Sequence, residues 1–189
     1  MRQEILINLV VYPLQVLGPG SRVGVWTQGC SLKCQGCMSP HTWSFDDDKK
    51  RDIKELVKEL KRYGSDAITI SGGEPFEQEN FVLFLQELKQ NDFKDVLVYS
   101  GLSEEKIRKQ FDIHLNYIDA LICEPFMEGL ETEFLYKGSD NQKLLILNKT
   151  LEEYYKNFKQ KKKDKKLQRF GNTIVGIPYQ SDIRNLYAV

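Results

Sequence analysis

The sequence predicts an α/β protein in which a mostly parallel sheet has its helices on the outside. Three observations favour this class. Segments typical of strands and of helices alternate along the 189 residues. The interior strand segments are continuous apolar runs, as in sheets buried on both faces. About six β/α units are too few for the eight strands and about 250 residues of a closed barrel, so we expect a partial (β/α)6 barrel or an open sheet.

Seven short segments have the composition of strands, being rich in β-branched and other apolar residues. Several are followed by glycine, proline or small polar residues, which end a strand in a turn. In chain order the expected strands are residues 5–11, 23–27, 67–70, 96–99, 118–123, 143–147 and 173–177. Residues 127–142 are polar and predict an irregular connection. Without a sequence repeat or a change in composition, we expect residues 1–189 to form a single domain.

Four helices are expected between these strands, each recognised by signals at its ends or by apolar residues three and four apart. The end signals are, in order, Asp46-Asp47-Asp48 at a helix start with Gly64 at its end, Pro75 in a first turn, Ser103 as N-cap, and Thr150 with Glu153 as a capping box. The apolar stripes are Ile53, Leu56, Val57 and Leu60; Phe81, Phe84, Leu85 and Leu88; and Leu151, Tyr154, Tyr155 and Phe158.

The overall composition excludes several classes of function. Apolar residues make up 41% of the chain, and 27 basic residues balance 27 acidic ones, so a dedicated nucleic-acid binder with a basic excess is not expected. No apolar run approaches the ~20 residues of a membrane helix. The start of the chain does not resemble a secretory signal. Together with clustered free thiols, this predicts a reducing, cytoplasmic location.

Three of the four cysteines, Cys30, Cys34 and Cys37, lie within eight residues in the spacing Cys-x3-Cys-x2-Cys. Three thiolates can hold three corners of a 4Fe–4S cubane and leave one iron open to a non-protein ligand. Zinc with His41 as fourth ligand is the alternative, but structural zinc sites usually use two ligand pairs, and no second pair exists. Three clustered cysteines also cannot pair evenly as disulfides. The spacing therefore favours an iron–sulfur cluster over zinc, and both over idle thiols.

A second informative segment, Ser71-Gly72-Gly73-Glu74-Pro75, follows the expected strand 67–70. Two glycines allow the backbone to approach a ligand closely, and the Glu74 carboxylate can accept hydrogen bonds from an ammonium group. Alone, the segment is equally an ordinary strand-to-helix turn. It gains weight from the cysteines that precede it.

Cys-x3-Cys-x2-Cys after an early strand and Gly-Gly-Glu-Pro after the next resemble the radical S-adenosylmethionine (SAM) superfamily. The resemblance implies a partial (β/α)6 barrel in which Cys30, Cys34 and Cys37 ligate a catalytic 4Fe–4S cluster. SAM would bind the open iron, with its amino group held by Gly72, Gly73 and Glu74. One electron would cleave SAM to methionine and a 5′-deoxyadenosyl radical, which abstracts a hydrogen atom from a substrate.

Further segments resemble a narrower family, the anaerobic ribonucleotide reductase activating enzymes. They are Gly18-Pro19-Gly20, Cys34-Gln35-Gly36-Cys37, Pro40-His41-Thr42-Trp43, Val98-Tyr99-Ser100-Gly101 and Lys137-Gly138-Ser139-Asp140-Asn141-Gln142. This resemblance implies a glycyl radical installed on a large partner enzyme, with a flavodoxin- or ferredoxin-type electron donor. It also implies contacts to SAM from Tyr99 and Ser100.

The chain departs from the narrower family at two places. Met38-Ser39 stands where the family has His-Asn, and Cys123-Glu124-Pro125-Phe126 stands where it has Asp-Gly-Pro-Phe. A radical SAM enzyme acting on another peptide or on a small molecule, such as a deazapurine precursor, therefore stays an alternative. A zinc-stabilised binding module is a further alternative from another class.

Several residues have both a structural and a functional interpretation. Trp26 is expected in the core or in a pocket wall, and Ile177 in a buried strand or beside adenine. Cys123 is expected to be a buried core thiol, with a hydrogen donor or acceptor near the radical as the alternative. The basic run 159–169 is expected to be solvated, or else to attract an acidic partner. Residues 138–142 are expected to form a turn whose role the sequence leaves open.

Overall fold

The computed structural model describes residues 3–163 and 167–179, and its centre is a seven-stranded sheet. The strands are β1 (Glu4–Leu14), β2 (Arg22–Thr27), β3 (Lys50–Asp52), β4 (Ala67–Gly72), β5 (Asp95–Tyr99), β6 (Ala120–Cys123) and β7 (Lys143–Ile146). Their order in space is β3-β1-β2-β4-β5-β6-β7. β2, β4, β5 and β6 pair in parallel, whereas β1 and β7 run the other way. The prediction of an α/β fold with a mostly parallel sheet is confirmed.

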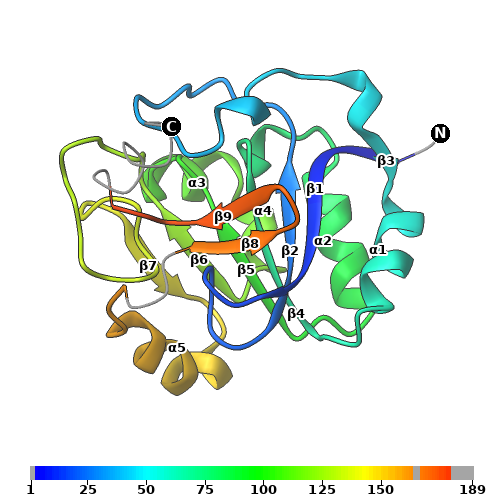
Figure 1. Cartoon of the computed structure of the whole chain (residues 1–189). Coiled ribbons are helices and arrows are strands. Elements are labelled where there is room, and N and C mark those ends of the chain that lie inside the picture. Colours follow the sequence, from blue (N-terminus) through cyan, green and yellow to red (C-terminus); the bar gives the residue numbers. More distant parts are fainter. Residues whose placement is uncertain (1–2, 164–166, 180–189) are drawn as a thin grey trace.

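Helices cover one face of this sheet, and a smaller layer covers the other (Figure 1). The first layer consists of α1 (Ile53–Lys61), α2 (Phe81–Gln90), α3 (Glu104–Gln110) and α4 (Asp112–Leu115). The second contains α5 (Glu152–Lys159) and a hairpin of β8 (Leu167–Phe170) and β9 (Thr173–Gly176). Short 3-10 turns are η1 (Pro40–Thr42), η2 (Asp47–Lys49), η3 (Pro75–Glu77) and η4 (Lys149–Leu151). Among the described residues, no helix is both long and apolar enough to cross a bilayer.

The two layers bury alternate residues of the same strands. On β5, Val96 and Val98 pack in the large cluster beneath α1 to α4, whereas Leu97 packs with Tyr155 and Phe158 of α5. Successive side chains of a strand point to opposite faces, so a strand buried on both faces must be apolar throughout. This explains the continuous apolar runs of the sequence.

The predicted helix starts needed correction at three places. Residues 46–48 open the short 3-10 turn η2 rather than α1, because β3 follows this turn and pairs with β1. α1 begins after Asp52, whose side chain accepts from the Glu55 amide at 3.1 Å. Pro75 starts the η3 turn rather than α2. Thr150 does not form a capping box, since Asn148 caps the preceding turn. Ser103 is confirmed as an N-cap, accepting from the Lys106 amide at 3.3 Å.

The irregular connection predicted over residues 127–142 is confirmed, since no helix lies between β6 and β7. It brings Lys143 back opposite Cys123, so β7 is antiparallel to β6. An antiparallel return needs no crossover helix. The expected last strand, residues 173–177, pairs with β8 in the separate hairpin rather than joining the main sheet. The partial barrel stays a prediction.

A buried ion pair joins β2 and β5 where these strands begin. Arg22 is fully buried; it pairs with Asp95 and donates to the Thr69 hydroxyl at 2.8 Å. The Tyr155 hydroxyl donates to the same Asp95 carboxylate at 2.6 Å. A Cβ on Gly18 would lie 2.6 Å from the Arg22 side chain, so the first glycine of Gly-Pro-Gly makes room for this pair. The ion pair lies where the strands begin, whereas the functional site lies at the opposite edge of the sheet, where the parallel strands end.

Candidate functional site

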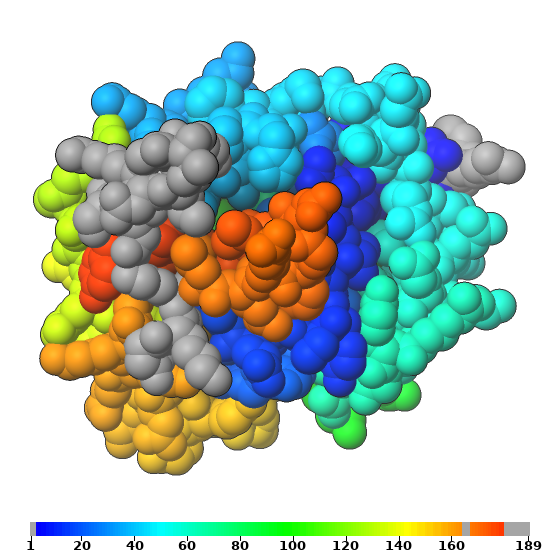
Figure 2. All heavy atoms as spheres, in the orientation of Figure 1, coloured from blue at the N-terminus to red at the C-terminus, as the bar shows by residue number. Residues whose placement is uncertain are grey.

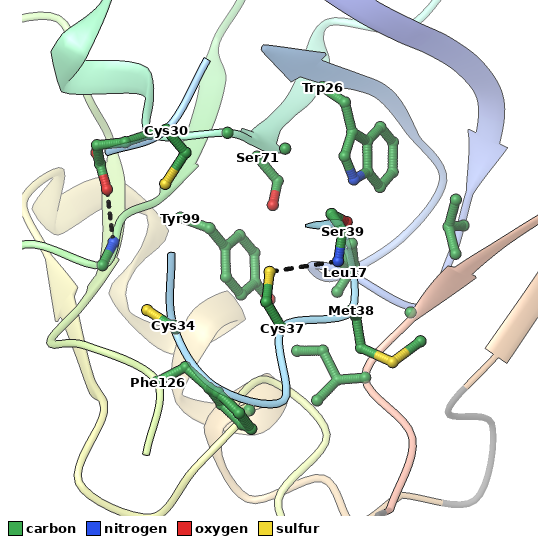
Figure 3. A pocket seen from close by; sticks show the side chains of 18 of the residues that line it. Leu17, Trp26, Cys30, Cys34, Cys37, Met38, Ser39, Ser71, Tyr99 and Phe126 are labelled. Atoms are coloured by element: carbon green, nitrogen blue, oxygen red, sulfur yellow. Dashed lines mark hydrogen bonds between the residues drawn. The ribbon is translucent and has the colours of Figure 1, made fainter. Parts of the chain in front are cut away.

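A pocket lies at the edge where β2, β4, β5 and β6 end, and the loops that follow these strands form much of its wall. This is the edge of a parallel sheet at which ligands bind in α/β proteins. Nine residues selected from the sequence line it: Trp26, Cys30, Cys34, Cys37, Gly72, Gly73, Glu74, Ser100 and Ile177. Figure 3 shows several of these side chains around the cavity. The structure therefore brings together residues up to 151 positions apart, from Trp26 to Ile177.

The cysteine loop is held by the segment that follows it. The Gly29 amide donates to the Thr42 carbonyl at 2.7 Å, and the Cys30 amide donates to the Trp43 carbonyl at 3.0 Å. The buried Gln28 side chain donates to the Ser44 carbonyl at 2.7 Å. These bonds close residues 30–41 into a loop at the pocket, so the thiols are placed by backbone contacts rather than by one another.

The three thiols are free, half-buried and lie on one pocket wall. Burial raises the pKa of the Cys30 and Cys34 thiols, so a bound cation is needed to hold them as thiolates at neutral pH. The Ser39 amide donates to the Cys37 sulfur at 3.3 Å. Within residues 3–163 and 167–179, no three His, Cys, Asp or Glu side chains converge on one metal ion. A cubane instead takes each thiolate on a different iron, and three free thiols around one cavity fit that donor set.

Gly72 and Gly73 serve a purpose that the sequence did not reveal. A Cβ on Gly73 would lie 2.2 Å from the Gly29 carbonyl oxygen, and one on Gly72 would lie 2.6 Å from the Thr27 backbone. The Gly73 amide donates to the Thr27 carbonyl and the Glu74 amide to the Gly29 carbonyl, both at 2.9 Å. The two glycines therefore allow the turn after β4 to pack directly on the start of the cysteine loop. Both also line the pocket.

Glu74 is 1% exposed, and its carboxylate joins two loops of the site. It accepts from the Ser100 hydroxyl at 2.8 Å, the Gly101 amide at 2.8 Å and the Phe76 amide at 3.2 Å. Burial raises the pKa of Glu74 to about 7, although these hydrogen bonds oppose the shift. An ionised carboxylate has about four acceptor positions, so one remains for a ligand.

The comparisons with known proteins show the family of the chain. A family model described as a 4Fe-4S single cluster domain matches residues 16–145. The anaerobic ribonucleoside-triphosphate reductase-activating protein of Enterobacteria phage T4 is 33% identical over 144 residues, which cover 71% of this chain and 90% of the relative. The chain belongs to the family of these activating proteins. It is thus a radical SAM enzyme of the glycyl-radical-activating type with a 4Fe–4S cluster domain.

Two further likenesses are weaker. The pyruvate formate-lyase-activating enzyme of Clostridium pasteurianum is 36% identical over 108 residues, covering 52% of this chain and 45% of that enzyme. The solved structure of QueE from Escherichia coli aligns over 52% of each chain with a TM-score of 0.46 and 21% identity. At this TM-score the likeness to QueE carries no argument about substrate.

In this activating-type enzyme, two residues that the sequence singled out, Cys123 and Glu124, do not line the pocket. Cys123 is fully buried beneath the helices and is absent from the pocket wall; burial raises the pKa of its thiol to about 12. Glu124 also points elsewhere, pairing with Lys143 at 3.1 Å and accepting from the Glu104 amide at 3.2 Å. Neither side chain takes the place of the family's Asp at the pocket.

Leu9 and Leu17 are pocket residues that could not be found from the sequence, because their segments carry no metal or ligand pattern and only the fold brings them to the wall. Tyr99, which the resemblance placed near SAM, also lines the pocket, as does Phe126 from the segment that departs from the family. The buried Tyr99 hydroxyl has no hydrogen-bond partner among the described residues. The β8–β9 hairpin adds β9 to the wall; Figure 2 shows the hairpin (orange) lying across β1 (blue). Residues 159–163 and 167–169 of the basic run do not line this pocket. Residues 164–166 of the run lie outside the described residues.

Proposed function

We propose that this enzyme cleaves SAM reductively and uses the resulting 5′-deoxyadenosyl radical to generate a glycyl radical on a large partner enzyme such as anaerobic ribonucleotide reductase. The observation that carries the proposal is the meeting of three free thiols and the buried Glu74 at one pocket, in a chain of this family. We place the whole reaction in one domain, residues 1–189, of the partial-barrel radical SAM type, in the cytoplasm.

Cys30, Cys34 and Cys37 would hold three irons of the cluster and leave the fourth for SAM. When bound, the cluster supplies the electron that cleaves the sulfonium of SAM to methionine and the 5′-deoxyadenosyl radical. Glu74 has one free acceptor position beside this wall and would receive an N–H of the SAM amino group. Ser100 would act through Glu74, because its hydroxyl proton is donated to that carboxylate. Trp26 and Ile177 would form an apolar wall for the adenosine and exclude water.

A pair of identical substitutions tests the cluster assignment. Cys34→Ala and Cys123→Ala each remove one thiol, but only Cys34 lies at the pocket. After anaerobic reconstitution with iron and sulfide, we expect Cys34→Ala to lose cluster absorbance and the release of 5′-deoxyadenosine from SAM under dithionite, whereas Cys123→Ala keeps both. Cleavage of SAM by the Cys34→Ala protein at the wild-type rate would contradict the assignment.

The partner is tested separately from SAM cleavage. We expect the reconstituted enzyme, SAM and a flavodoxin- or ferredoxin-type donor to give a glycyl-radical doublet in the electron paramagnetic resonance spectrum of an anaerobic ribonucleotide reductase. A reductase in which the radical-bearing glycine is replaced by alanine is the control. Rapid SAM cleavage without a doublet, accompanied by a mass-shifted peptide or small molecule, would favour the alternative of a different substrate.

A further inference from the structure

Residues 138–142 form a clamp on the turn that follows β6. The Gln142 side-chain amide donates to the Glu124 carbonyl at 3.1 Å, and the Asn141 amide donates to the Pro125 carbonyl at 2.8 Å. Ser139 is fully buried, and its hydroxyl accepts from the Met127 amide at 3.1 Å. Three polar side chains of one short segment therefore bond to the backbone of one four-residue turn, 124–127.

The clamp also holds itself in shape. The Gly138 amide donates to the Gln142 side-chain oxygen at 2.7 Å, so Gln142 is bonded at both ends. The turn that it holds starts at Glu124, which has φ +84. A non-glycine residue with such a φ persists only where the surrounding structure fixes it. The hydrogen bonds of residues 138–142 supply that restraint from one side, and the Leu102 carbonyl, which accepts from the Glu124 amide at 2.9 Å, supplies it from the other.

The turn presents Phe126 to the cysteines. Glu124 donates its amide to Leu102, Pro125 has no N–H, and Met127 donates to Ser139. The remaining amide, that of Phe126, faces the Cys34 thiol closely enough to lower its pKa, against burial and Cys37, which raise it. Figure 3 shows Phe126 beside Cys34 and Cys37.

The Phe126 ring is fixed as well as its amide. A Cβ on Gly138 would lie 3.1 Å from Cδ2 of the ring and 3.3 Å from the Gln142 side-chain oxygen. Gly138, Gln142 and Phe126 all line the pocket. The absence of a side chain at Gly138 thus permits the Cδ2–Cε2 edge of the ring to lie close to the clamp at the pocket wall.

We propose that Gly138, Ser139, Asn141 and Gln142 are positioning residues that hold the amide and ring of Phe126 over the Cys34 side of the cluster. Hydrogen bonds to cluster sulfurs and exposure to solvent set the reduction potential of an iron–sulfur cluster. An N–H donor favours the reduced, more negative cluster, so the clamp raises its potential. This inference rests on the proposed role of Cys34 as a cluster ligand.

Gln142→Met tests the clamp without changing charge, and the chain offers a matched control. Gln168 has the same two bonds as Gln142, donating to the Pro13 carbonyl at 2.6 Å and accepting from the Gln15 amide at 2.9 Å, but it does not line the pocket. In the cluster-free protein we expect amide hydrogen exchange in 124–127 to rise at least tenfold in Gln142→Met and to stay unchanged in Gln168→Met. In the reconstituted protein, we expect the midpoint potential to become more negative in Gln142→Met alone.

Gly138→Ala is the second variant, in case Gln142→Met does not retain a cluster. Its Cβ displaces only the ring and the Gln142 oxygen, so we expect a smaller shift of the potential in the same direction. Equal potentials in Gly138→Ala, Gln168→Met and wild type, or a positive shift, would overturn the inference. Failure of the proposed function would be a different result: the Cys34→Ala protein would keep its cluster and cleave SAM. It is therefore distinguishable from failure of the clamp inference.

Discussion

The buried carboxylate of Glu74 makes a prediction about stability that needs no cofactor. Burial raises its pKa from an ordinary 4.5 to about 7 in the folded chain. Between these two values the unfolded chain has released the proton while the folded chain still retains it. The free energy of unfolding therefore falls as pH rises from about 4.5 to 7 and is then constant with respect to this group.

The size of this effect follows from the shift. Each pKa unit corresponds to about 1.4 kcal/mol, so a rise from 4.5 to about 7 lowers the stability of the folded state by roughly 3 kcal/mol above pH 7. Glu74→Gln abolishes this dependence. Its amide nitrogen would face the N–H of Gly101 or Phe76, or the Ser100 hydroxyl, each of which now donates to the carboxylate. An unpaired donor costs about 1–3 kcal/mol at every pH.

The difference between the two proteins should therefore change with pH. We expect Glu74→Gln to be less stable than wild type near pH 4.5 and equally or more stable at pH 8. The assay is urea unfolding of the cluster-free protein under reductant across this range. Glu105→Gln, at an exposed carboxylate of α3, should keep the wild-type pH dependence. A wild-type minus Glu74→Gln difference that is flat from pH 4.5 to 8 would refute the reasoning.

Three other substitutions probe separate parts of the fold. Gly73→Ala places a Cβ 2.2 Å from the Gly29 carbonyl oxygen, so we expect it to displace the cysteine loop and to lower the iron content after reconstitution; full iron content would contradict this. Tyr155→Phe removes a hydrogen bond to the Asp95 carboxylate that pairs with Arg22 and should lower the free energy of unfolding by about 2 kcal/mol while SAM cleavage persists. Cys123→Ser places a hydroxyl in a fully buried apolar site and should lower the melting temperature without changing iron content, whereas a loss of iron would mean that this thiol reaches the cluster.

Local sequence was sufficient for the buried parallel strands and for one helix start, but not for β3 and β8, which no expected strand covers. β2, β4 and β5 lie within one or two residues of the expected segments, because continuous apolar runs reflect burial on both faces. Ser103 was identifiable as an N-cap because its hydroxyl bonds within its own turn. Residues 46–48 were misassigned because pairing of β3 with the distant β1 overrides a local preference for a helix start.

The sequence alone determined which atoms are available for chemistry: three thiols in one loop and a carboxylate after two glycines, each defined by spacing along a few residues. Only the tertiary structure decided what surrounds them. The Cys123 side chain lies in the core beneath the helices, and the Gly29 backbone packs directly against Gly73. The 138–142 clamp reaches the cysteine loop through Phe126. These placements depend on strand order and on side-chain alternation across a sheet, which join residues far apart in the chain and leave no mark on their immediate neighbours.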